Sequence, residues 1–321
     1  MTIAWVLGSG GLLGTALCRV LRANGTRLFC PAERFSWNSA PELAAQIATS
    51  VESFASQVAA ADRWEMYWAA GVGTMSCSQQ DLAPETSALS LLLGLFASES
   101  RLMSTSGAIA FASSAGAVYA GSRDDIITEN TLPAPTTVYA REKLRQEDLI
   151  RSFAATNIRA TALVARISTL YGPGQAAGKQ QGLLAHIARK VLRNQPIQIY
   201  VPYDTIRDYI AADDAAAAMV AALRTTSEKP RVLIKIIASE YPATIAEIIS
   251  IFKRVARRAP RIVTSASRLS ALYARRVQFR SVALPGGGTS RKSLLVGIAE
   301  LVAAERTAFV RSQTTWTAPN S

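Results

Sequence analysis

The residues best suited to proton transfer are Tyr139 and Lys143, which stand four positions apart. In a helix this spacing places both side chains on one face. The lysine ammonium can then lower the pKa of the phenol, which at its ordinary value of about 10 is a poor base at neutral pH. Ser113 and Ser114 precede them and offer hydroxyls that could hydrogen-bond a substrate oxygen. This set predicts that Tyr139 exchanges a proton with a substrate oxygen.

A second group with chemical meaning is the glycine-rich run near the N-terminus. Gly8, Gly11 and Gly14 give the spacing GxxGxxG between an apolar run and a helical pattern that opens with Leu12 and Leu13. At such a place a pyrophosphate can approach bare backbone and lie at the N-terminus of a helix. We therefore expect these five residues to bind a dinucleotide, with Lys143 holding its nicotinamide ribose.

The choice between NAD and NADP should be made where the second strand ends, at Cys30-Pro31-Ala32-Glu33-Arg34. The Glu33 carboxylate could accept a hydrogen bond from a ribose 2′-hydroxyl, which would favour NAD. Arg34 could instead pair with a 2′-phosphate. Both cofactors stay open, and Arg34 favours NADP because no acid follows the strand directly.

Apolar runs and helical patterns alternate along the chain, and these elements must position the groups above. Strands are expected at 2–7, 27–30, 65–70, 107–112, 158–167 and 232–237, and helices from 12 to 23 and at 41–61, 85–103, 140–155 and 181–194. Uninterrupted apolar strands alternating with helices indicate an α/β fold with a doubly wound parallel sheet, Rossmann-like, covered on both faces.

The charge is unevenly distributed. Residues 1–223 hold 18 Lys and Arg against 18 Asp and Glu, whereas residues 224–321 hold 17 against 5, so the last third carries the net charge of +12. This shift indicates a smaller C-terminal α/β lobe, with an anionic partner such as a nucleotide diphosphate, nucleic acid or acidic membrane. A solvated basic surface is the alternative. Sparse aromatic residues and the lack of a nucleic-acid motif lead us to expect no nucleic acid.

Several classes of protein are excluded by simpler features. The 321 residues, 49% of them hydrophobic, are enough for a large core. Three cysteines without a CxxC pair or a histidine cluster predict a reducing compartment and no metal site. No signal peptide and no apolar run of membrane-spanning length are found, so we expect a cytoplasmic protein without membrane association.

With these motifs in place, the chain resembles the extended short-chain dehydrogenase/reductases of the NAD-dependent epimerase/dehydratase family, which act mostly on nucleotide sugars. The family's usual third strand ending in Asp is not found between residues 31 and 64, where only one helical segment is expected. The motifs that carry the resemblance are the glycine run, Trp68-Ala69-Ala70-Gly71, Ser113-Ser114 to Tyr119, Tyr139 to Lys143, Arg166 to Gly174, Arg207-Asp208-Tyr209-Ile210, Asp213-Asp214 and Ser293 to Ile298.

The resemblance implies a division of the chain and a set of partners. Residues 1–172, with a return segment near 205–237, would form the NAD(P)-binding domain, and residues 173–204 and 238–321 the substrate lobe. The substrate would be a nucleotide-diphosphate sugar used in polysaccharide synthesis. A homodimer through the helices at 85–103 and 140–155 is possible in the family.

The resemblance also implies roles for single residues. Tyr139 would be the acid/base and Lys143 its partner. The family's catalytic serine or threonine position holds Ala115 here, so Ser114, or alternatively Ser113, must substitute. The cofactor would be bound by the residues named above together with Ala69, Ala70, Gly71 and Ser113, and the substrate by Ser114, Thr169 and Arg207. The arginine fork suits a diphosphate.

The same region discriminates among reactions. Dehydratases of this family carry Asp-Glu directly after the active-site threonine, whereas Ala115 and Gly116 follow Ser114 here. The resemblance therefore implies a 4-epimerase, which oxidises the sugar at C4 and reduces it from the other face. An NADPH-dependent 4-ketoreductase and a catalytically idle, NAD(P)-binding regulatory relative are the alternatives.

Overall fold

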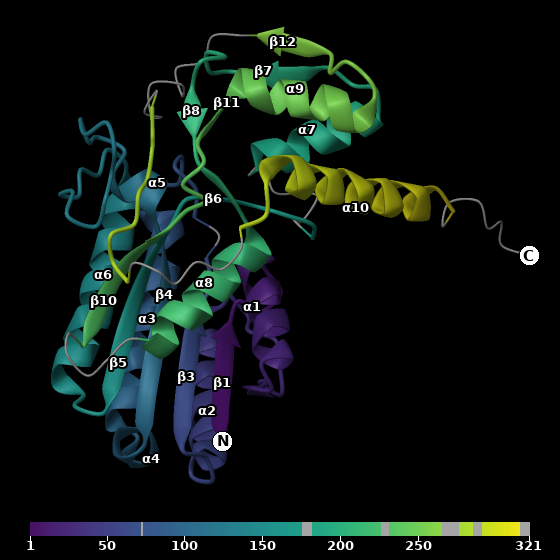
Figure 1. Ribbon diagram of the computed structural model, residues 1–321. Coiled ribbons are helices and arrows are strands. Elements are labelled where there is room, and N and C mark those ends of the chain that lie inside the picture. The colour runs from purple at the N-terminus through teal and green to yellow at the C-terminus, as the bar shows by residue number, and fades with distance from the viewer. Residues whose placement is uncertain (72, 175–181, 226–230, 265–275, 285–290, 315–321) are drawn as a thin grey trace, which may run out of the picture.

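A parallel sheet of six strands forms the centre of the molecule, shown in Figure 1 for the computed structural model, which describes residues 1–71, 73–174, 182–225, 231–264, 276–284 and 291–314. The strand order is β10-β5-β4-β3-β1-β2, and every neighbouring pair is parallel. The expected strands are confirmed with small shifts at their ends: β1 Thr2–Leu7, β2 Arg27–Phe29, β3 Arg63–Trp68, β4 Ser106–Ser114, β5 Ala160–Ile167 and β10 Val232–Ile237.

Helices cover both faces of this sheet, which confirms the doubly wound fold. One apolar core lies between the sheet and the helices α1 and α8, and a second lies on the opposite face against α2, α3 and α6 (Figure 1). The bounds are α1 Leu12–Ala23, α2 Ala40–Val58, α3 Gln79–Ser98, α6 Val138–Thr156 and α8 Ala212–Thr225, with the short helices α4 Ser100–Ser104 and α5 Ala115–Val118.

The sheet ends at β2, in agreement with the single helical segment expected between residues 31 and 64. In the part of the chain that the structure describes, only α2 lies between β2 and β3, and β3 pairs directly with β1. Aromatic side chains fill the core beside this short edge. The ring of Trp5 lies 5.1 Å from that of Phe29 and 5.4 Å from that of Phe54, measured between centroids.

A smaller lobe with its own apolar core lies beyond the carboxyl edge of the sheet (Figure 1). It contains α7 Leu183–Leu192, α9 Ile245–Ala256 and α10 Leu294–Thr314, with the parallel pair β7 Ile197–Ile199 and β12 Ile262–Thr264. Residue 181, where α7 was expected to start, lies outside the described residues. The remaining pairs are β6 Thr169–Tyr171 with β9 Tyr209–Ala211 and β8 Ile206–Arg207 with β11 Ala243–Thr244. The assignment of this lobe to the substrate stays a prediction.

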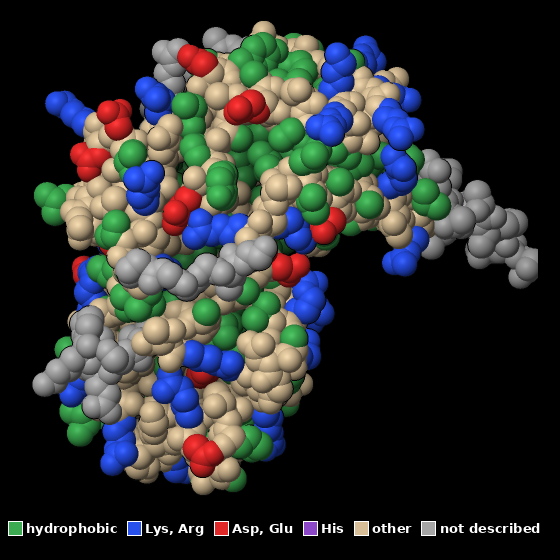
Figure 2. Space-filling model, viewed as in Figure 1, with side chains coloured by type: hydrophobic (Ala, Val, Ile, Leu, Met, Phe, Trp, Pro, Cys, Tyr) green, Lys and Arg blue, Asp and Glu red, His purple; other side chains and the backbone are tan. Residues whose placement is uncertain are grey.

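Part of the basic charge of this lobe lies at the C-terminal ends of its own helices. Figure 2 shows Lys and Arg side chains gathered over it. Arg189 and Lys190 lie in the last turn of α7, and Lys253 and Arg254 in the last turn of α9, where cations oppose the negative end of the helix dipole. Among the described residues, no helix combines the length and the hydropathy that crossing a bilayer requires.

Candidate active site

The glycine-rich turn lies between β1 and α1, as the sequence predicts. Gly8 adopts a φ of +84°, and the N–H of Gly11 donates to the Gly8 carbonyl at 2.9 Å. A Cβ on Gly14 would lie 2.0 Å from the Gly8 carbonyl oxygen, and a Cβ on Gly8 would lie 2.5 Å from the backbone nitrogen of Ala70, whereas the space beside Gly10 is open. The turn is therefore closed toward the protein and open on its other side, which fits a pyrophosphate.

The beginning of α1 provides donors for such an anion. Its N-cap is Gly11, which has no side chain to satisfy the N–H groups of the first turn, formed by Leu12 and Leu13. Ala69-Ala70-Gly71 follows β3 at the same edge of the sheet, where the Ala69 N–H donates to the Leu7 carbonyl at 2.9 Å. The structure thus brings the two backbone segments predicted to bind the cofactor into direct contact.

Replacing Gly14 by alanine should test this close packing. The added Cβ would meet the Gly8 carbonyl, so we expect the free energy of unfolding to fall by about 1–3 kcal/mol and dinucleotide binding to weaken. Denaturant unfolding and calorimetric titration with NAD and NADP measure the two effects. Gly10→Ala, where the Cβ has open space, is the stability control. Equal stability of the two variants would contradict the prediction.

Glu33 and Arg34 lie in the loop after β2, at the same edge of the sheet, and both side chains are exposed. Both side chains are therefore accessible from solvent. Because both Glu33 and Arg34 are exposed in this loop, the preference for NADP stays a prediction.

Tyr139 and Lys143 lie on the first turns of α6, whose N-cap Thr137 accepts a hydrogen bond from the Ala140 N–H at 3.2 Å. Tyr139 is half-buried, and the Lys143 Nζ lies 5.8 Å from the centre of its ring. Burial raises the pKa of the Tyr139 phenol above its ordinary value, the nearby Lys143 lowers it and the carboxylate of Glu85 raises it. The nearby Ser114 hydroxyl also lowers this pKa. The structure therefore brings Ser114, Tyr139 and Lys143 together.

The ammonium of Lys143 is buried among polar partners. Its Nζ donates to Glu85 Oε1 at 2.8 Å and to Gln146 Oε1 at 3.0 Å, and it lies 5.1 Å from the centre of the Phe111 ring. Burial alone would lower the pKa of Lys143, but the ion pair with Glu85 keeps it above its ordinary value. The lysine is thus held as a cation beside the phenol.

The two serines at the end of β4 have different surroundings. Ser113 is buried, and its hydroxyl donates to Glu147 Oε1 at 2.7 Å. Glu147 is in turn bound by Arg166 through two hydrogen bonds of 3.0 and 2.7 Å. Ser114 is half-buried and is the serine whose hydroxyl interacts with Tyr139. The geometry therefore supports Ser114 over Ser113 as the hydroxyl next to the reacting atoms.

The predicted substrate residues lie on the lobe side of the sheet. Thr169 begins β6 and is exposed, and Arg207 ends β8 with a half-buried side chain that donates to the Ile206 carbonyl at 2.7 Å. The carboxylate of Asp208 is buried and accepts hydrogen bonds from the Ser168 and Ser239 hydroxyls. Asp208 therefore anchors the segment that carries Arg207.

Two residues of the site were not predicted. Glu85 belongs to the buried stripe of α3 together with Leu82 and Leu89, and an acid in a mostly apolar stripe could have indicated a buried ion pair. Cys77 precedes α3, accepts a hydrogen bond from the Thr74 N–H at 3.2 Å and lies close enough to raise the pKa of Tyr139. No local pattern distinguishes this cysteine, because only the chain path brings it to the phenol.

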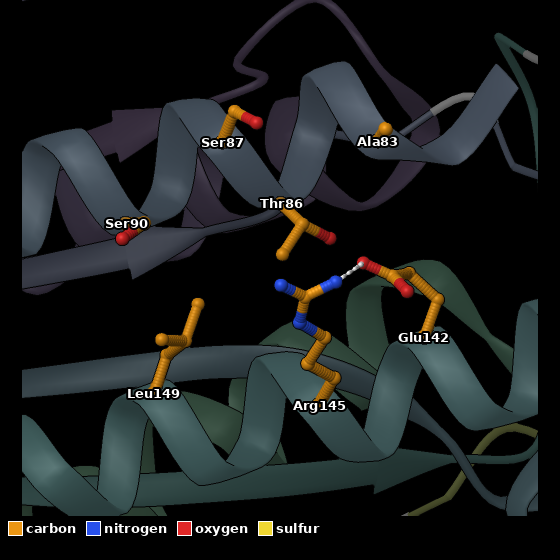
Figure 3. Close-up of a pocket in the computed structure, with 7 residues that line it drawn as sticks. All are labelled: Ala83, Thr86, Ser87, Ser90, Glu142, Arg145 and Leu149. Carbon is orange, nitrogen blue, oxygen red and sulfur yellow. Dashed lines mark ion pairs between the residues drawn. The ribbon is translucent and has the colours of Figure 1, made fainter. Parts of the chain in front are cut away.

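A shallow groove separates α3 and α6 on the side turned away from the sheet. Figure 3 shows Arg145 and Glu142 of α6 pointing toward each other as an ion pair across from Thr86 of α3. These are the two helices expected to form a dimer interface. The homodimer itself stays a prediction.

Comparisons with known proteins identify a matching family. The model of the NAD dependent epimerase/dehydratase family matches residues 4–234. The chain is 32% identical over 101 residues to a dTDP-L-rhamnose 4-epimerase of Burkholderia thailandensis, and 33% identical over 115 residues to a dTDP-4-dehydro-6-deoxyglucose reductase of Escherichia coli. The two matches cover 31% and 36% of this chain, and they span only 28% and 36% of the length of those relatives.

Among solved structures, the fold is similar to that of UDP-glucose 4-epimerase from Thermus thermophilus in complex with NAD. The TM-score is 0.78 at 19% sequence identity, over 96% of this chain and 100% of the other. At this identity the likeness concerns the fold, including the smaller lobe.

Proposed function

The chain belongs to the NAD-dependent epimerase/dehydratase family, and from this premise we propose that it is an enzyme that exchanges a hydride between NAD or NADP and a nucleotide-diphosphate sugar. The observation that carries the proposal is the convergence of Ser114, Tyr139 and Lys143 at the carboxyl edge of the sheet that also holds the glycine-rich turn. The bound dinucleotide would supply the hydride exchange.

Each group has a role that follows from its position. Tyr139 takes the proton of the sugar hydroxyl as the hydride leaves, and returns it when the hydride comes back. Lys143 stabilises the phenolate form by its charge. Ser114 hydrogen-bonds the same sugar oxygen and orients it. The turn of Gly8 to Gly14 and the first turn of α1 hold the pyrophosphate, and Arg207 binds the diphosphate of the substrate.

Among the reactions of this family, we propose a 4-epimerase. The residues directly after Ser114 are Ala115 and Gly116 in α5, so this segment brings no further acid or base for an elimination. Hydride transfer and a single phenol are sufficient to oxidise C4 and reduce it from the other face. The similarity to a dTDP-L-rhamnose 4-epimerase supports this choice.

A 4-ketoreductase is the second candidate, and Glu85 favours it. Its carboxylate offsets the charge of Lys143 and so favours the protonated phenol, which is the form that donates a proton to a carbonyl oxygen. The similarity to a dTDP-4-dehydro-6-deoxyglucose reductase points the same way.

Analysis of the purified protein by absorbance and mass spectrometry distinguishes these candidates. An epimerase regains its cofactor within each cycle, so we expect tightly retained NAD that is not consumed while UDP- or dTDP-sugars are converted. An empty site that oxidises NADPH stoichiometrically with a keto-sugar nucleotide would make the protein a reductase and give Arg34 its role. A bound dinucleotide without hydride transfer to any nucleotide sugar would indicate a regulatory relative. Failure to bind either dinucleotide would overturn the proposal as a whole.

A further inference from the structure

Glu85 is a buried carboxylate that reaches the tyrosine–lysine pair from a different helix. It lies on α3, 58 positions before Lys143, and its Oε1 accepts from the lysine Nζ at 2.8 Å. The side chains of both partners are 7% exposed. Gln146 Nε2 donates to the same Oε1 at 3.2 Å and to the Thr86 hydroxyl at 2.9 Å. The carboxylate is therefore fixed in one place by the lysine and by its neighbours on two helices.

This arrangement limits what the lysine can do. An ammonium has three N–H donors, and Glu85 and Gln146 accept two of them here. The Phe111 ring closes a further side at 5.1 Å from the Nζ. On the other side of Glu85, a Cβ on Gly71 would lie 3.0 Å from its Oε2, so the carboxylate also lies against the backbone that follows β3. One donor of Lys143 is left for the phenol or a bound ribose.

We propose that Glu85 is a positioning residue of the tyrosine–lysine pair, which fixes the Lys143 ammonium and offsets its positive charge beside the Tyr139 phenol. A charge at hydrogen-bonding distance in a buried site acts strongly on its neighbours, because little solvent screens it. The catalytic meaning of this inference rests on the proposed function, whereas the charge relation itself does not.

The consequence for Tyr139 follows from the groups that face it. Lys143 on α6 and the Ser114 hydroxyl on β4 lower the pKa of the phenol, whereas burial, Glu85 on α3 and Cys77 before α3 raise it. Removing the charge of Glu85 takes away one of the groups that raise this pKa, and the charged Lys143 then acts on the phenol without an opposing carboxylate. The phenolate must then form at lower pH than in the wild type.

The experiment is a titration of tyrosinate absorbance in the full-length protein without ligand. The chain has nine tyrosines, so the curve of Tyr139→Phe is subtracted from that of the wild type to isolate Tyr139. The same subtraction is made in Glu85→Gln, against Glu85→Gln/Tyr139→Phe. We expect the Tyr139 transition to move to lower pH in Glu85→Gln. An unchanged transition, or one that moves to higher pH, would overturn the proposal.

Two further variants keep the test decisive. Gln146→Glu adds a second carboxylate on the Lys143 ammonium and should move the transition in the opposite direction, to higher pH. If Glu85→Gln does not fold, Gln146→Glu serves as the test in its place. An unchanged Tyr139 transition in Gln146→Glu would also contradict the proposal. Glu142→Gln removes another buried carboxylate of α6, one that faces Arg145 instead of Lys143, and should leave the transition in place. A shift in Glu142→Gln as large as that in Glu85→Gln would show a general charge effect and overturn a specific role.

The titration needs neither substrate nor cofactor, so its failure is distinct from a failure of the proposed function. A shift in the expected direction in a protein that converts no nucleotide sugar would support the charge relation and contradict only the proposed enzyme. Turnover of a nucleotide sugar with no shift of the Tyr139 transition in Glu85→Gln would support the proposed enzyme and contradict the role of Glu85.

Discussion

Replacing Tyr139 by phenylalanine should lower turnover of the nucleotide sugar by about 10²–10⁴-fold, the usual contribution of a positioned acid–base group. The substitution removes one hydroxyl from a half-buried side chain and keeps the ring that packs beside the Lys143 ammonium. We therefore expect an unchanged fold and unchanged dinucleotide affinity. Steady-state kinetics with the nucleotide sugar that the wild type converts, together with calorimetric titration of the cofactor, measure both.

Tyr241→Phe is the matched control, because Tyr241 is 77% exposed and lies outside the predicted site. It should retain wild-type turnover. Wild-type turnover in Tyr139→Phe would remove the central element of the proposed function. Loss of dinucleotide binding in that variant would instead show that the phenol has a structural role in the cofactor site.

The fold, and the parts of the candidate site whose residues lie close together in the sequence, could be predicted from the sequence. The i to i+4 spacing puts Tyr139 and Lys143 on one face of their helix independently of the packing of that helix. The spacing of Gly8, Gly11 and Gly14 reflects close contacts in the turn and the start of the helix that follows it. The parallel sheet could also be predicted from local sequence. A strand that is buried on both faces has no alternation of polar and apolar residues, so it is recognised as an uninterrupted apolar run.

What could not be predicted depends on contacts between distant segments. Glu85 meets Lys143 only because α3 and α6 pack against each other on one face of the sheet. Cys77 comes near Tyr139 because the loop before α3 lies against the start of α6, where a Cβ on Gly73 would lie 3.0 Å from the Tyr139 ring. The choice between Ser113 and Ser114 has the same origin. It depends on the direction that each side chain takes from β4, and on Glu147 accepting from the buried one.

The largest effect on stability should come from Arg166, which holds the buried carboxylate of Glu147 beneath the site. The two side chains are 3% and 0% exposed and share two hydrogen bonds of 2.7 and 3.0 Å. Arg166→Met removes the cation and leaves Glu147 buried with Ser113 and the half-exposed Arg151 as its partners. We expect the free energy of unfolding to fall by about 3–5 kcal/mol, measured by denaturant unfolding.

Two comparison variants separate the cost of an unpaired charge from the loss of packing. Arg151 also binds Glu147, at 3.0 Å, but its side chain is 36% exposed, so Arg151→Met should cost about 1 kcal/mol or less. In Arg166→Met/Glu147→Leu no buried charge remains, and much of the lost stability should return. Equal losses in Arg166→Met and in the double variant would show that the arginine stabilises the fold by its packing. Recovery in the double variant would show that an uncompensated Glu147 is what destabilises the strand end that carries Ser114.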